Sequence, residues 1–155
     1  MLRVKTFQQT QTGYCGPASL KMVLAYFGVE KSEKQLARLT RCSKKYGSEA
    51  EHILSAVKTL GFKGLVKDFS SFDDIRKFVI NKRIPVIVDW FSVDDGHYSV
   101  VVGIDKKSIH FNDPENGKLR EMSLKKFKTV WFDFPEDFLR SKKDLRIRRM
   151  LVIYK

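Results

Sequence analysis

One cysteine in this sequence has the surroundings of a nucleophile, because Cys15 is followed by Gly16 and Pro17 at the expected start of a helix. The first turn of a helix carries unpaired N–H groups and partial positive charge, and both favour the thiolate that attacks a carbonyl carbon. Many cysteines are buried in cores without a chemical role. The flanking Gly13 and Gly16 favour an accessible thiol instead. The sequence therefore predicts that Cys15 is a nucleophile.

A candidate general base lies at the entry of an apolar strand. His97 follows Gly96 and precedes a β-branched run, and a strand end holds a side chain rigidly while leaving it open to a partner. Asp113 ends the next predicted strand, eight residues after Asp105, just as His97 lies eight residues before it. A hairpin turning at Asp105 would bring the two side chains level, so that the Asp113 carboxylate could hold the imidazole in one tautomer. Asn112 would point to the opposite face, and the other two histidines are interpreted as structural.

Acyl transfer also requires hydrogen-bond donors for the oxyanion that develops on the carbonyl oxygen. The backbone N–H of Cys15 is one candidate, and an upstream side-chain amide would be a second. Three glutamines, Gln8, Gln9 and Gln11, lie in the polar segment before Cys15. Chemistry alone does not choose among them.

The helices that must position these residues come first in the chain. Apolar residues at helical spacing predict a helix from residue 15 or 16 to about 27, namely Leu20, Val23, Leu24 and Phe27. Two capping-box patterns, Ser32 with Gln35 and Ser48 with Glu51, predict the starts of two further helices. Another helix is expected over residues 72–81.

Strands are expected in the second half of the chain, after Pro85. They are predicted over residues 85–91, 97–104, 108–112, 118–122, 130–134 and 149–154, with a short helix over 123–128. Helices followed by an antiparallel sheet define an α+β class, and the length fits a single domain over residues 1–155.

The composition limits the compartments and ligands to expect. Hydrophobic residues make up 43% of the chain, which is enough for a core. No apolar run approaches the ~20 residues that span a bilayer, and the polar start lacks the apolar segment of a secretory signal. Two cysteines, Cys15 and Cys42, suggest neither a disulfide framework nor a zinc site. We therefore expect free thiols, a cytoplasmic location, and no metal or cofactor.

The chain has a net charge of +12, and its basic residues are denser near the end, over residues 140–149. Such a surface attracts acidic peptides, nucleic acid or anionic membranes. A solvated basic face is the simpler interpretation, because no nucleic-acid-binding motif accompanies it. The sequence thus gives no clear nucleic-acid or membrane signal, and no particular oligomeric state is predicted.

Three segments contain the candidate residues: QTQTGYCGPASLKMVLAYFG, GHYSVVVGI and IHFNDPENGKLREMSLKKF. Their spacing places a glutamine six residues before Cys-Gly, a Gly-His pair before a strand, and an Asp-Pro pair after the next strand. Together they resemble the bacteriocin-processing, double-glycine leader peptidases of the papain-like clan. The resemblance runs from Gln9 to about Val152.

The resemblance implies a papain-like α+β fold, in which a helical half bears the cysteine and an antiparallel sheet bears the histidine and the aspartate. It implies that Cys15 is the nucleophile, His97 the base and Asp113 the orienting acid. It also selects Gln9 as the amide of the oxyanion hole. The implied reaction is hydrolysis of a peptide or protein substrate, often after a Gly-Gly pair in a leader peptide. Many members form the N-terminus of an ABC transporter, whereas this sequence is expected to be a standalone member.

Two other classes of function are compatible with the same residues. A thiol acyltransferase, an amidase or a deubiquitinase-like hydrolase could use the same triad on another acyl group. Alternatively, a catalytically idle papain-like domain could bind a leader peptide, nucleic acid or an acidic partner. A binding module needs no nucleophile, base and orienting acid together, so the complete set favours the enzyme.

Overall fold

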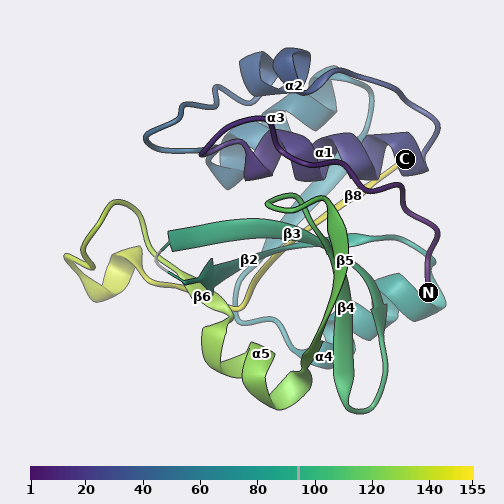
Figure 1. Ribbon diagram of the computed structural model, residues 1–155, viewed down its shortest axis with the longest axis vertical. Coiled ribbons are helices and arrows are strands. Elements are labelled where there is room, and N and C mark those ends of the chain that lie inside the picture. Colours follow the sequence, from purple (N-terminus) through teal and green to yellow (C-terminus); the bar gives the residue numbers. More distant parts are fainter. Residues whose placement is uncertain (94) are drawn as a thin grey trace.

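A helical layer packs on an antiparallel sheet in the computed structural model, which describes residues 1–93 and 95–155 (Figure 1). Three helices form the layer at the top of Figure 1: α1 (Cys15–Tyr26), α2 (Glu33–Leu39) and α3 (Ala50–Thr59). The opposite end of the molecule carries α4 (Phe72–Arg76), the π-helix η1 (Lys77–Asn81) and α5 (Leu124–Val130). The helix expected over residues 72–81 is therefore present as α4 continued by η1.

Six strands form the main sheet in the order β1–β8–β2–β3–β4–β5, and all neighbouring pairs are antiparallel. Their bounds are β1 (Lys63–Lys67), β2 (Val86–Ser92), β3 (Asp95–Ile104), β4 (Ser108–Asp113), β5 (Lys118–Ser123) and β8 (Arg149–Tyr154). A second sheet pairs β6 (Phe132–Asp133) with β7 (Arg146–Ile147), close to the 3-10 turn η2 (Lys142–Asp144). The predicted α+β class with an antiparallel sheet is confirmed.

The first two helices form as the sequence predicts. Leu20, Val23 and Leu24 of α1 are fully buried, and the helix packs on β3. At the start of α2 the Ser32 hydroxyl accepts the N–H of Gln35, while the Gln35 side chain accepts the N–H of Ser32. This reciprocal capping box satisfies two donors that a helix start would otherwise leave unpaired.

The second predicted capping box is wrong. The N-cap residue of α3 is Glu49, and its side chain makes no capping hydrogen bond. Ser48 is buried, and its hydroxyl lies 3.2 Å from the Thr40 hydroxyl at the end of α2. The Ser48 side chain therefore joins two helices rather than capping one, because tertiary packing offers it a buried partner.

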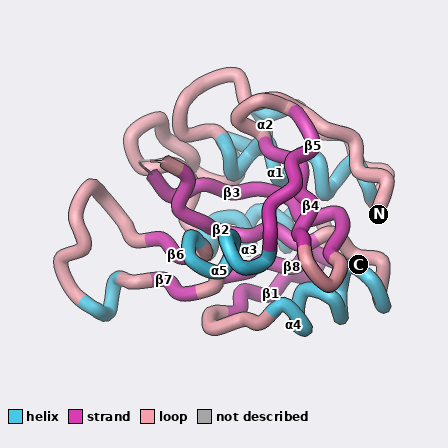
Figure 2. Tube along the Cα trace, turned by 60° about the horizontal axis from the view of Figure 1, so that its bottom comes forward, coloured by secondary structure: helices cyan, strands magenta, loops and turns pink. Residues whose placement is uncertain are grey.

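The strands differ from the predicted ones in three places, one of which is the short strand β7, which the sequence pattern does not predict. The sequence pattern does not reveal β1, whose exposed lysines at both ends break the apolar run; Figure 2 shows it beside β8, which lies between β1 and β2. The strand predicted over residues 130–134 is wrong in extent. Phe127 and Trp131 lie one helical turn apart and are both buried, so α5 continues to Val130 and only Phe132–Asp133 is extended.

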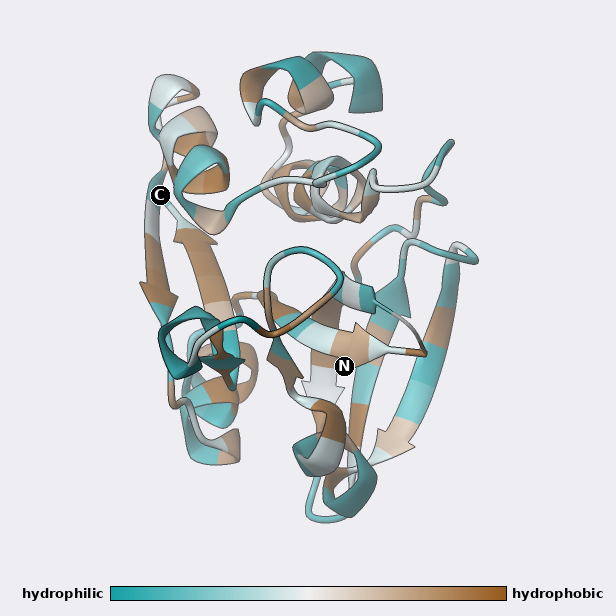
Figure 3. Cartoon of the chain, turned by 90° about the vertical axis from the view of Figure 1, so that its left-hand side faces the viewer, coloured by the Kyte–Doolittle hydropathy of each residue, from teal (hydrophilic) through white to brown (hydrophobic). Residues whose placement is uncertain are grey.

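The core lies between the helical layer and the central strands. Buried apolar side chains of α1, β2, β3 and β8 form one continuous cluster, and Figure 3 shows the most hydrophobic strand segments beneath the helices. Within residues 1–93 and 95–155, none of the helices has the length and apolarity needed to cross a bilayer.

Candidate active site

Cys15 is the first residue of α1, so its sulfur lies at the positive end of the helix. The preceding turn requires Gly13, which has φ of +84°, and a Cβ there would lie 2.8 Å from the carbonyl oxygen of Lys44. The Cys15 Sγ accepts a hydrogen bond from the backbone N–H of Tyr98 at 3.5 Å. The helix start and strand β3 therefore meet at the sulfur, one residue from His97.

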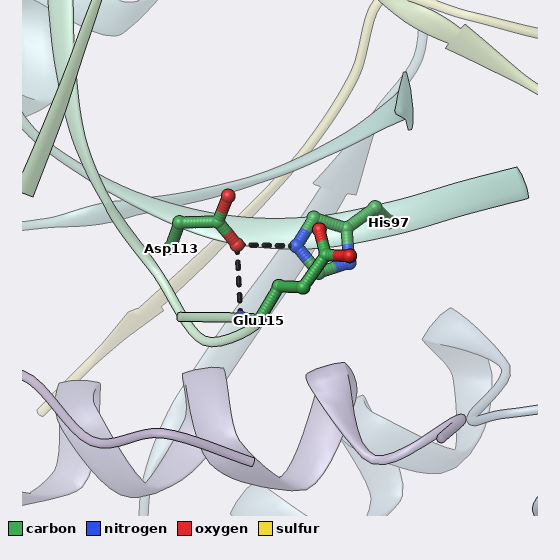
Figure 4. Close-up of side chains that lie close together, drawn as sticks. All are labelled: His97, Asp113 and Glu115. Carbon is green, nitrogen blue, oxygen red and sulfur yellow. Dashed lines mark hydrogen bonds and ion pairs between the residues drawn. The ribbon is translucent and has the colours of Figure 1, made fainter. Parts of the chain in front are cut away.

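His97 and Asp113 form a buried hydrogen-bonded pair on the neighbouring strands β3 and β4 (Figure 4). The imidazole Nε2 lies 2.5 Å from Asp113 Oδ1, and the two side chains are 10% and 0% exposed. The predicted symmetric pairing is wrong in detail, because the hairpin turns over residues 105–108 rather than about Asp105; a β-bulge between Val101 and Gly103 then brings Val100 opposite Asn112. Asp113 is thus level with Ser99, which shares a face of β3 with His97, and the ring reaches it diagonally.

The charges of this pair support each other. Burial disfavours the imidazolium, but the hydrogen bonds of Asp113 and Cys15 and their charges outweigh burial and raise the pKa of His97 from 6.5 to about 10. Burial also disfavours the carboxylate, yet His97 and then Arg120 lower the pKa of Asp113 from 3.8 to about 2. Since Nε2 faces the carboxylate, Nδ1 is the ring nitrogen available to the sulfur.

Two residues that the sequence pattern does not single out surround the pair. Arg120 of β5 donates from Nη1 to Asp113 Oδ2 at 2.7 Å. Its guanidinium lies 5.7 Å from the ring centroids of both Trp90 and Phe111. Trp90 is buried and meets the His97 ring edge-on, with 5.9 Å between the centroids. Only the pairing of β2 with β3 and of β4 with β5 brings these side chains together, so no local sequence signal identifies them.

Gln9 is fixed beside the loop that follows Asp113. Its backbone N–H donates to the carbonyl oxygen of Pro114 at 2.7 Å. Its Nε2 donates to the carbonyl oxygen of Gln11 at 3.1 Å. The buried Oε1 accepts no hydrogen bond from the part of the chain that the structure describes. The residue is therefore held by one hydrogen bond from its backbone and one from its side-chain nitrogen.

One cleft, called here the active-site cleft, connects the candidate residues. Its lining includes Gln9, Gln11, Cys15, His97 and Glu115. Gln8 differs from the other two glutamines, because its Nε2 donates to the carbonyl oxygen of Glu115 at 3.2 Å. The structure thus brings Gln9, Cys15 and His97 to one cleft, with Asp113 buried behind the ring.

His97, Asp113 and Glu115 also offer ligand atoms that lie within 4.8 Å of one another, as a cation site would require (Figure 4). Most of these atoms are already engaged. Asp113 Oδ1 accepts from the Glu115 backbone N–H at 3.0 Å in addition to its bond with His97, and Arg120 occupies Oδ2. We interpret the group as a hydrogen-bonded pair with the exposed Glu115 carboxylate next to the ring.

The raised pKa of His97 leads to a testable titration. The imidazolium is expected to persist above the ordinary value of 6.5 and to lose its proton only near pH 10. In an Asp113→Asn variant the midpoint of the His97 titration should move to lower pH. Burial lowers the pKa of His97, and the Asp113 charge that counteracts burial is then absent. NMR of the imidazole carbon, assigned by comparison with His97→Ala, measures both midpoints. A wild-type midpoint near 6.5 would show that the ion pair does not form.

A cysteine at a helix start beside a histidine–aspartate pair on an antiparallel sheet is the arrangement of a papain-like cysteine peptidase, which is a hydrolase. The Peptidase C39 family model matches residues 3–134, and the chain belongs to this family. The family resemblance noted in the sequence is therefore confirmed.

Relatives and solved structures agree with this membership. The transport/processing ATP-binding protein ComA of Streptococcus pneumoniae is 30% identical over 123 residues, which cover 76% of this chain but only 16% of ComA. An uncharacterized protein of Methanothermobacter marburgensis is 33% identical over 111 residues, with 70% of this chain and 71% of the relative covered.

The solved peptidase domain of Streptococcus ComA, a bi-functional ABC transporter, is 25% identical, with a TM-score of 0.77 and 98% of both chains covered. A double-glycine motif protease from an AMS/PCAT transporter, solved in complex with the leader peptide, shares the fold with a TM-score of 0.74 and 22% identity. That comparison covers 98% of this chain and 91% of the protease.

Proposed function

We propose that this C39 peptidase cleaves leader peptides after a Gly-Gly pair, with Cys15 as nucleophile, His97 as base and Asp113 as the orienting acid. One observation carries the proposal: the sulfur at the start of α1 lies against β3, next to the buried His97–Asp113 pair. An idle binding module would gain nothing from a buried carboxylate that keeps an imidazole charged beside a thiol.

The chemistry follows from the positions of the donors. The Cys15 thiolate attacks the carbonyl carbon of the scissile bond, and its backbone N–H donates to the oxyanion. Gln9 adds a second donor, because an amide nitrogen carries two hydrogens and only one is used by the Gln11 carbonyl. The His97 imidazolium then protonates the leaving amine, and a water activated by His97 hydrolyses the thioester.

The Gly-Gly preference is supported by the relatives. The solved double-glycine motif protease with a bound leader peptide has the same fold, and ComA is named as a transport and processing protein. Glycines also line the path to the sulfur, since Gly13 and Gly96 both line the active-site cleft.

The substrate is tested with a synthetic leader peptide and a matched peptide in which Leu-Leu replaces Gly-Gly. We expect cleavage after the second glycine, located by mass spectrometry, and a kcat/KM lower by about 100-fold or more for the Leu-Leu peptide. A free carboxylate in the product, even with an added amine acceptor, identifies hydrolysis rather than acyl transfer. Equal cleavage of the two peptides would refute the Gly-Gly preference, and failure to cleave any peptide would refute the peptidase assignment.

A further inference from the structure

A second hollow opens beside Cys15 and is unusually acidic for this chain. Among the residues that the structure describes, six acidic side chains line it, against three basic ones. The acidic residues are Glu49, Asp89, Asp95, Asp133, Glu136 and Asp137. We call this hollow the acidic pocket. On a protein of net charge +12, such a concentration of carboxylates gives the pocket a charge opposite to that of its surroundings.

Asp89 lies at the inner wall of the acidic pocket, where its carboxyl group has no hydrogen-bond donor among the described residues and its charged neighbours are Asp133 and, at 4.0 Å, Arg146. Its side chain is 1% exposed, and neither oxygen accepts a hydrogen bond from any residue that the structure describes. A buried carboxylate without a partner is costly, so its presence in a pocket wall points to a ligand that supplies the missing donors. Burial and then the neighbouring Asp133 raise the pKa of Asp89 well above its ordinary value. A cation that entered would favour the ionised form instead.

Asp133 of β6 shares the inner wall with Asp89. Its carboxylate lies so close to Gly96 that a Cβ on Gly96 would overlap it, so a larger residue before His97 would displace the Asp133 side chain. Arg146 does not neutralise the two carboxylates by hydrogen bonding. Its Nη1 is 4.0 Å from Asp89 and 3.9 Å from Asp133, while its Nη2 donates to Glu49 at 2.8 Å.

The position of the acidic pocket indicates which part of a substrate enters it. β6 and the loop beyond it lie beside the ends of β2 and β3 (Figure 1). Cys15 lines both hollows, whereas Tyr98 lines only the acidic pocket and His97 and Gln9 line only the active-site cleft. His97 must reach the leaving amine, so the C-terminal part of the substrate lies in the active-site cleft. The N-terminal part, which becomes the acyl group on the sulfur, therefore runs toward the acidic pocket.

We infer that the acidic pocket is a specificity subsite that binds a lysine or arginine side chain of the substrate, on the N-terminal side of the scissile bond. This inference rests on the proposed peptidase function and adds a substrate class to it. The ammonium or guanidinium group would donate to the Asp89 and Asp133 carboxylates. A buried, charge-assisted hydrogen bond of this kind discriminates strongly against neutral side chains.

The test uses a series of peptides in which the Gly-Gly pair is kept and lysine, or its neutral analogue norleucine, occupies each position before that pair in turn. At one position the wild-type chain is expected to cleave the lysine peptide with a kcat/KM about tenfold or more above that of the norleucine peptide. Asp89→Asn should bring this ratio close to one. The asparagine amide can donate to the neighbouring Asp133 carboxylate, so the fold should persist, and circular dichroism checks it. Asp133→Asn serves as a second variant.

Asp73→Asn is the matched control, because it removes one carboxylate from α4, where the side chain is 90% exposed and lies outside the pocket. It should keep the wild-type ratio. Cleavage without preference for lysine at any position, or an unchanged ratio in folded Asp89→Asn and Asp133→Asn, would overturn the inference while leaving the peptidase function intact. Failure of the wild-type chain to cleave any peptide would overturn both.

Discussion

Replacing Cys15 by alanine is expected to lower kcat for peptide cleavage by about 10⁵- to 10⁶-fold, the scale seen when a nucleophile is removed from a catalytic triad. The proposed thioester cannot form without the sulfur, and no other described residue of the active-site cleft offers a thiol. The substitution should leave the fold intact, because alanine is a good helix former at the start of α1. Cleavage assays and covalent labelling by a thiol-directed peptide warhead measure the loss.

Cys42→Ser is the matched control for the nucleophile. Cys42 is also a free thiol near the same loop, and its Sγ donates to the carbonyl oxygen of Gly13 at 3.2 Å. Burial raises the pKa of Cys42, so its thiolate is disfavoured. A serine hydroxyl keeps the donor to Gly13, and we expect activity within a few-fold of wild type. Retained cleavage by Cys15→Ala, or an equal loss in Cys42→Ser, would show that Cys15 is not the nucleophile.

Asp113→Ala is expected to lower kcat by about 10⁴-fold, as the loss of an orienting carboxylate does in comparable triads. Without the carboxylate, burial would favour neutral His97 and nothing would fix the ring against the sulfur. We also expect the free energy of unfolding to fall by about 3 kcal/mol. This is the lower end of the cost of removing one partner of a buried ion pair, because the Arg120 that remains is partly exposed to water. Cleavage assays and urea denaturation measure the two effects.

The pH dependence separates the charge of Asp113 from its volume. The pKa of Asp113 is lowered to about 2, so its charge stabilises the fold fully above pH 3.8 and this contribution is lost as the pH falls through 2. The difference in unfolding free energy between wild type and Asp113→Ala should shrink over that interval. Arg120→Gln is the comparison. Because the Arg120 side chain is 38% exposed, this substitution should lower kcat by less than tenfold. A larger loss of kcat in Arg120→Gln than in Asp113→Ala would contradict the greater importance that we assign to Asp113.

Much of the candidate site could be predicted from short-range features. The apolar spacing of Leu20, Val23 and Leu24 defines α1 and thereby places Cys15 at its start, and both statements need only the helical period. His97 was identifiable because an apolar strand follows it, and Asp113 because a second strand ends there. Their meeting followed from hairpin topology, although the turn lies further along the chain than predicted and the β-bulge in β3 is what brings Asp113 to the face that bears His97.

Local patterns failed where distant segments compete for the same residue. Ser48 has the sequence of a capping residue, yet its hydroxyl is paired with Thr40 in the packed helices. The apolar run after Val130 has the composition of a strand, yet the burial of Trp131 extends α5. In both cases a tertiary contact outweighs a propensity worth about 1 kcal/mol or less.

By itself the sequence determined the helix that bears Cys15 and the strands that bear His97 and Asp113, because these depend on periodicity and on spacing along one hairpin. It indicated the class of protein through the resemblance of its three motifs to a known family. Only the tertiary structure decided the surroundings. Arg120 and Trp90 reach the pair across strand pairings. Asp89 and Asp133, 44 residues apart in the sequence, line the acidic pocket only because β6 packs against β2 and β3. The electrostatics of a site depend on separation in space, which the order of residues does not contain.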